Sequence, residues 1–155
     1  MVAVLALARF GLGGEGLVAA VFAAVLVLLA AIDLEQRIVP NRIVLPATAV
    51  VLVGNLIVFS DRRAEFVLAT VGAGLLLLLP LLIYPAGMGK GDVKLAMLLG
   101  AGLGAAVITA FVVGFLTAFI VALGILATRG VEARKTGIPF APFLAAGGLV
   151  ALFLG

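Results

Sequence analysis

Long apolar runs separated by short polar stretches form the main pattern of this chain. The runs cover about residues 17–32, 43–59, 66–84, a short run that ends near 103, 105–127 and 138–154. A transmembrane helix needs about 20 predominantly apolar residues. The pattern therefore predicts an all-α integral membrane protein, a polytopic bundle of about six transmembrane helices joined by short loops.

The composition supports lipid as the solvent of most of the chain. Of 155 residues, 66% are hydrophobic and 11% are charged, whereas a soluble domain has about 25% charged residues. A small domain leaves much of its surface exposed, so it cannot hide this many apolar side chains from water. We expect one membrane-embedded domain over residues 1–155. Residues 1–16, broken by Arg9, Glu15 and four glycines, are expected to form a surface or partly inserted segment.

Basic residues are distributed unequally between the two sets of alternating loops. One set holds Arg37, Arg42, Lys90, Lys94, Arg129, Arg134 and Lys135, and the other holds Arg9, Arg62 and Arg63. Cytoplasmic loops carry the excess of lysine and arginine. The first side is therefore predicted to be cytoplasmic, with both termini outside, and Asp33 and Asp92 fall on that side.

Several kinds of chemistry are excluded by the residues that the chain lacks. It has no Cys and no His, and Ser60 is its one serine. Nucleophilic Ser-His-Asp and Cys-His systems cannot be built, nor can a zinc site of the usual His/Cys type. We expect no metal and no cofactor. The net charge of +3 comes from residues spread over short loops, without the basic stripe of a nucleic-acid-binding protein.

Two aspartates stand at predicted helix ends. Asp33 ends the first apolar run, where a carboxylate opposes the helix dipole; its simplest interpretation is a water-facing boundary residue paired with Arg37 one turn later. Asp92 ends the stretch Gly87-Met-Gly-Lys-Gly-Asp92, and its simplest role is a helix N-cap. The glycines also allow positive φ and close backbone approach, so an extended peptide can lie against this loop.

The pair has a stronger interpretation than either residue alone. Two neighbouring carboxylates in a low dielectric resist simultaneous ionisation, and one proton shared between two carboxylates is the working state of an aspartic protease. The ionised partner accepts a proton from the attacking water while the protonated partner donates to the scissile carbonyl. This chemistry needs no His, Cys or metal.

Three separated stretches resemble the type IV prepilin peptidases, which are membrane aspartyl proteases of the GxGD type. The first is Ala31-Ile-Asp33 followed by Val39-Pro40-Asn41, with Val39 where Ile is usual. The second is Gly89-Lys-Gly-Asp92-Val-Lys94, and the third is Ile138-Pro-Phe-Ala-Pro-Phe143. The chain is similar to the short members of the family, without the N-terminal methyltransferase and cysteine-rich region.

This resemblance implies an endopeptidase with Asp33 and Asp92 as its catalytic pair. The implied substrate is a prepilin-like protein, cut at the cytoplasmic face of the inner membrane between a basic leader and an apolar helix. Supporting or substrate-binding roles fall to Gly89, Gly91, Lys94, Pro40 and Asn41. Methyltransferase activity is not predicted.

The role of Lys94 stays open at this point. Lys94 either supports the site or reaches lipid headgroups. Pro40 and Asn41 shape the turn into the second span, and Pro139 and Pro142 stand where a helix begins. The resemblance does not name the substrate or the oligomeric state.

Two alternatives come from other functional classes. One is a catalytically inactive pilus-assembly scaffold, which the presence of both aspartates disfavours. The other is a small proton-coupled membrane carrier, because intramembrane carboxylates often mark transport pathways. In this chain the acids lie at span ends rather than at the midplane, which disfavours the carrier.

Overall fold

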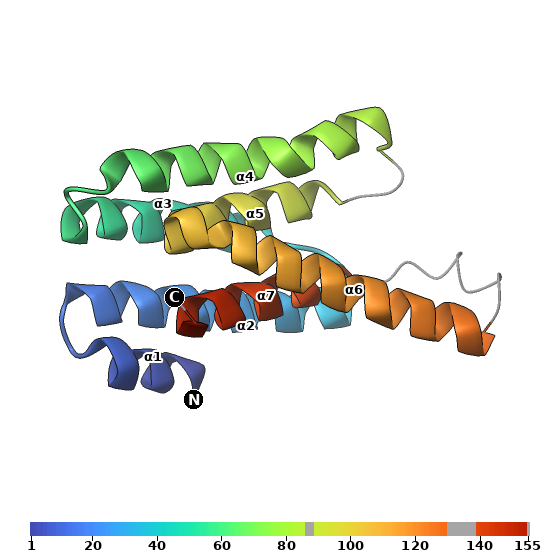
Figure 1. Cartoon of the computed structure of the whole chain (residues 1–155), viewed down its shortest axis with the longest axis horizontal. Helices are drawn as coiled ribbons and strands as arrows, with labels where there is room; N and C mark the ends of the chain where they lie inside the picture. Colours follow the sequence, from blue (N-terminus) through green and yellow to red (C-terminus); the bar gives the residue numbers. More distant parts are fainter. Residues whose placement is uncertain (86–88, 130–138, 155) are drawn as a thin grey trace.

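The computed structural model describes residues 1–85, 89–129 and 139–154, and this part of the chain contains helices and no strand (Figure 1). The helices are α1 (Val2–Phe10), α2 (Gly14–Gln36), α3 (Asn41–Val58), α4 (Arg63–Ile83), α5 (Lys90–Leu103), the 3₁₀ turn η1 (Gly104–Ala106), α6 (Val107–Arg129) and α7 (Ala141–Leu154). The predicted all-α polytopic fold class is confirmed.

The helices α2 to α7 form an up-and-down bundle. Figure 1 shows α2, α4 and α6 running in one direction and α3, α5 and α7 running back. Helix α5 packs mainly against α4 and α3, while α7 packs against α6 and α2. Because the direction alternates, the end of α2 and the start of α5 lie at the same end of the bundle.

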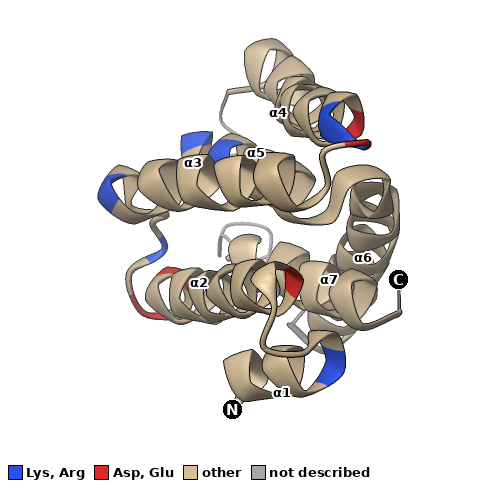
Figure 2. Ribbon diagram, turned by 90° about the vertical axis from the view of Figure 1, so that its left-hand side faces the viewer, with Lys and Arg blue, Asp and Glu red and all other residues tan. Residues whose placement is uncertain are grey.

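Four helical stretches are long and apolar enough to cross a membrane. They are Gly14–Gln36, Asn41–Val58, Arg63–Ile83 and Lys90–Thr128, and Ala141–Leu154 is a shorter apolar helix. The last long stretch contains α5 and α6, which reverse direction at η1 (Figure 1). The six predicted spans therefore correspond to α2 through α7, and the predicted break near residue 104 falls at η1. Figure 2 shows Lys, Arg, Asp and Glu near helix ends, with the middles of the helices free of them.

Small residues allow the helices to approach closely in the core. A Cβ added to Gly100 would lie 2.3 Å from the Ala69 carbonyl oxygen, and one added to Gly102 would lie 2.4 Å from the Phe22 ring. Close approach through small residues is typical of packed membrane helices. Gly72 differs, because a Cβ there would meet nothing within 4 Å.

The first residues of the chain form a short helix against the start of α2. Ala6 of α1 is fully buried, while Val4 and Leu5 are exposed. The turn into α2 requires glycine twice: Gly11 has φ 81°, and a Cβ on Gly16 would lie 1.8 Å from the Gly11 carbonyl oxygen. Helix α2 consequently begins at Gly14, three residues before the predicted span.

Candidate active site

Asp33 is a buried residue in the last turn of α2. The helix continues to Gln36, and Arg37, in the left-handed conformation with φ 54°, ends it by donating its N–H to the Asp33 carbonyl at 2.8 Å. Asp33 is only 6% exposed. The interpretation of Asp33 as a water-facing residue paired with Arg37 is therefore wrong. Within the described part of the chain the one ion pair is Arg62–Glu65, so Arg37 acts on Asp33 as a neighbouring charge.

The start of α7 reaches the Asp33 carboxylate. The backbone amide of Ala141, the first residue of α7, lies near this carboxylate, and Ala141 is fully buried. A helix N-terminus is a favourable neighbour for an anion. The carboxylate oxygen Oδ2 of Asp33 is buried and has no hydrogen-bond partner among the described residues.

Sequence reasoning did not identify Ala141. The sequence feature that could have indicated it is the pair of prolines on either side, which mark a helix start. Pro139 precedes α7, and Pro142 lies in the first turn, where a backbone N–H has no partner within the helix. Phe140 begins the helix by accepting the N–H of Phe143 at 3.1 Å. Ile138, the first residue of this predicted motif, lies outside the described residues.

Asp92 lies in the first turn of α5 and is 9% exposed. The prediction that Asp92 is the N-cap residue is wrong, because Gly89, three residues earlier, occupies the N-cap position. The Asp92 carboxylate reaches back instead, and its Oδ2 accepts the Gly89 N–H at 3.3 Å. This is the reciprocal half of a capping box, in which an acidic side chain at the third helical position binds the N-cap amide.

Asp33, in the last turn of α2, and Asp92, in the first turn of α5, lie at the same end of the bundle, and the charge of Asp33 acts on the Asp92 carboxylate. They come from helices that make few direct contacts, α2 and α5. Neighbouring elements therefore determine how the two acids are placed: α7 beside Asp33, and α3 beside the first turn of α5.

Two contacts join the α2–α3 connection to the first turn of α5. A Cβ added to Gly91 would lie 2.6 Å from the Val39 Cβ, so only glycine fits at this distance. Lys94 Nζ donates a hydrogen bond to Asn41 Oδ1. Pro40 stands between these contacts as the N-cap residue of α3, with φ −68°.

The structure gives a different physical reason for the glycines of this loop than the one that was predicted. Gly89 has φ −77° and Gly91 lies inside α5, so neither adopts the positive φ that was expected to favour glycine. Close approach to Val39 explains Gly91 instead. Gly87 of the same loop, like Arg134 and Lys135 of the predicted cytoplasmic set, lies outside the described residues.

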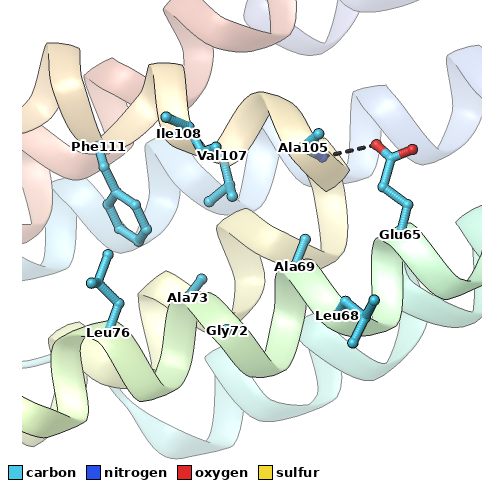
Figure 3. A pocket seen from close by; sticks show the side chains of 10 residues that line it. All are labelled: Glu65, Leu68, Ala69, Gly72, Ala73, Leu76, Ala105, Val107, Ile108 and Phe111. Atoms are coloured by element: carbon cyan, nitrogen blue, oxygen red, sulfur yellow. Dashed lines mark hydrogen bonds between the residues drawn. The ribbon is translucent and has the colours of Figure 1, made fainter.

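A cavity of about 650 Å³ lies elsewhere, between α4 and the start of α6 (Figure 3). Its lining is apolar apart from Glu65, whose Oε1 accepts the Ala105 N–H at 2.9 Å. It includes neither aspartate. Across the described ranges no group of three His, Cys, Asp or Glu could hold a metal ion. The buried carboxylate pair is therefore the candidate site, and two such groups can share a proton and activate water.

Known proteins resemble this chain over most of its length. The model of the type IV leader peptidase family matches residues 20–128. The prepilin leader peptidase/N-methyltransferase of Burkholderia pseudomallei (strain K96243) is 38% identical over 97% of this chain and 50% of that protein. The corresponding proteins of Xanthomonas campestris pv. campestris and Bacillus subtilis (strain 168) are 33% and 31% identical, each over 95% of this chain and over 53% and 59% of their own lengths.

The chain thus spans about half the length of the first two of these relatives. No solved structure is significantly similar to it. The family match covers Asp33 and Asp92 together with the contacts that join their helices. The chain belongs to the type IV leader peptidase family.

Proposed function

We propose that this chain is an aspartic endopeptidase that removes the leader peptide of type IV prepilin-like proteins. The observation that carries the proposal is the pair of buried carboxylates of Asp33 and Asp92, which lie at the same end of the bundle. Burying charge without pairing it is costly, so a pair of acids kept in this arrangement calls for a functional reason. Family membership gives that reason as peptide hydrolysis.

In the proposed mechanism the two carboxylates share one proton. The ionised carboxylate accepts a proton from water as the water oxygen attacks the scissile carbonyl carbon, while the protonated carboxylate donates its proton to the carbonyl oxygen. When the C–N bond breaks, the amine leaves with a proton returned by the first carboxylate. Every proton is thus moved by Asp33 or Asp92, and no covalent intermediate with the protein forms.

The proposed substrate has a basic leader followed by an apolar helix that remains in the membrane. The site lies with Arg37, Arg42, Lys90 and Lys94, on the side that the excess of basic residues assigns to the cytoplasm. We therefore place cleavage at the cytoplasmic face of the membrane, within one peptidase domain over residues 1–155. Gly89 and Pro40 have shaping roles, as the N-cap residues of α5 and α3. We do not extend the proposal to methyl transfer.

A cleavage assay tests this function. The protein in lipid nanodiscs is given a prepilin-like substrate, with Asp33→Asn and Asp92→Asn beside the wild type. Each variant should lower the cleavage rate by at least about 100-fold, because general acid–base catalysis contributes about 10² to 10⁴. Thermal unfolding confirms that the variants are folded. Cleavage by folded variants at the wild-type rate would reject the catalytic pair, and a wild type that cuts no leader would favour the inactive scaffold.

A further inference from the structure

The strongest unassigned feature is the contact between Lys94 and Asn41. These residues are 53 positions apart in the sequence, yet the Lys94 ammonium donates to the Asn41 side-chain oxygen. Asn41 is the first residue of α3, and Lys94 lies in the first turns of α5. The bond therefore joins the element that follows Asp33 to the element that carries Asp92.

The packing of the helices explains why this hydrogen bond matters. Helices α2 and α5 touch little, whereas α3 packs against both. Near the site, the connection between α2 and α3 meets α5 where Gly91 lies against Val39. The hydrogen bond between Lys94 and Asn41 lies next to this close contact with the Val39 side chain and joins α5 directly to the start of α3.

We propose that Lys94 and Asn41 are positioning residues whose hydrogen bond sets the separation of the Asp33 and Asp92 carboxylates. The proposal rests on the proposed peptidase function. Neither residue needs to touch the substrate, because Lys94 follows Asp92 by two positions, which is about 200° around the helix. Lys94 thus faces α3 while Asp92 faces the site.

The contact also distinguishes Lys94 from a lysine that reaches lipid headgroups. Lys94 is partly buried and its ammonium is engaged by Asn41. Lys90, one turn earlier at the start of α5, is exposed. Lys90 is therefore the matched control: the same charge on the same helix, without the contact to Asn41.

Kinetics give the first test. We expect Lys94→Met and Asn41→Leu each to lower kcat by about 10- to 100-fold with KM unchanged, because small misplacements of reacting groups cost up to about 100-fold. The double variant should be no slower than either single one, and Asn41→Asp, which keeps an acceptor, should retain activity. Lys90→Met should match the wild type. A raised KM with unchanged kcat, or additive losses, would overturn the positioning role.

A distance measurement makes the test independent of catalysis. The chain has no cysteine, so Gln36→Cys and Lys90→Cys allow paired spin labels at two exposed sites on α2 and α5. In nanodiscs, Lys94→Met should broaden or shift the distance distribution, and Asn41→Asp should leave it unchanged. If Lys94→Met leaves the distribution unchanged, the positioning role is rejected even when cleavage is lost. If the distance distribution shifts but the wild type cuts no leader, the positioning role of Lys94 and Asn41 is supported and the peptidase proposal fails.

Discussion

The two ends of the bundle treat their acidic residues differently. At one end Glu65 makes three hydrogen bonds: two from Arg62, at 2.9 and 2.7 Å, and one from the Ala105 N–H at 2.9 Å. At the other end Asp92 accepts one backbone bond at 3.3 Å, and Oδ2 of Asp33 has no partner in the described part of the chain. Glu65 is partly exposed, whereas both aspartates are buried.

Their neighbours differ in the same way. Arg62 lies over the rings of Phe59 and Phe66, at 5.9 and 5.6 Å from their centroids. Close by, the buried Asn55 side chain donates to the Ala101 carbonyl at 2.8 Å, where α5 runs out of helical partners. The Glu65, Arg62 and Asn55 side chains are thus satisfied by protein contacts.

This comparison separates an acid with structural contacts from the two acids of the proposed catalytic site. An acid that caps a turn and pairs with arginine stabilises the fold. Burying an acid without a paired charge costs stability, and titratable groups in such surroundings cluster at functional sites. Substitutions at the two ends should therefore affect different measurements.

The largest effect among these substitutions is expected at Gly91. In Gly91→Ala the new Cβ would lie 2.6 Å from the Val39 Cβ and 3.0 Å from its Cγ2, which displaces the first turn of α5 and with it Asp92. We expect kcat/KM for leader cleavage to fall by about 100-fold.

Val39→Gly provides the matched rescue, because it removes both clashing carbons and leaves the Val39 nitrogen at 3.4 Å. The double variant should cleave at the rate of Val39→Gly alone. Gly72→Ala is the control, because a Cβ there meets nothing within 4 Å. A double variant as slow as Gly91→Ala would show that this contact is not the cause.

A smaller effect, on stability rather than cleavage, is expected at Glu65. Glu65→Ala removes the acceptor of the Ala105 N–H and the partner of Arg62, which should lower the free energy of unfolding by about 1–2 kcal/mol. Glu65→Gln keeps an acceptor and should lose less. Thermal unfolding in detergent measures both. The leader-cleavage rate should stay within about twofold of the wild type, because distant sites act independently. A loss of cleavage as large as that of Gly91→Ala would contradict the difference in role between the two ends.

The smallest effect is expected at Arg62. Arg62→Lys keeps the charge but loses the two-pronged bond to Glu65 and the flat contact with Phe59 and Phe66, worth about 0.5–1 kcal/mol at an exposed site. The same unfolding measurement should show a small decrease. In a Phe66→Leu background the decrease should shrink, because residues in contact are energetically coupled; an equal decrease in both backgrounds would mean that the ring contact contributes nothing.

Apolar patterning and spacing in the sequence predicted the fold class and the break between α5 and α6. They also indicated the two aspartates with their flanking motifs as candidate site residues. These features are local. An apolar run reports a membrane span because lipid cannot hydrogen-bond to the backbone.

Only the tertiary structure showed what surrounds each acid. The burial of Asp33, the Ala141 amide beside it, the reason for Gly91 and the bond between Lys94 and Asn41 all involve residues far apart in the chain. The apolar periodicity of the sequence does not predict such contacts, because they form only when the helices pack together. The sequence alone therefore predicted which groups are candidates for chemistry in this protein, and the packing of α3 and α7 around them decided how those groups are held.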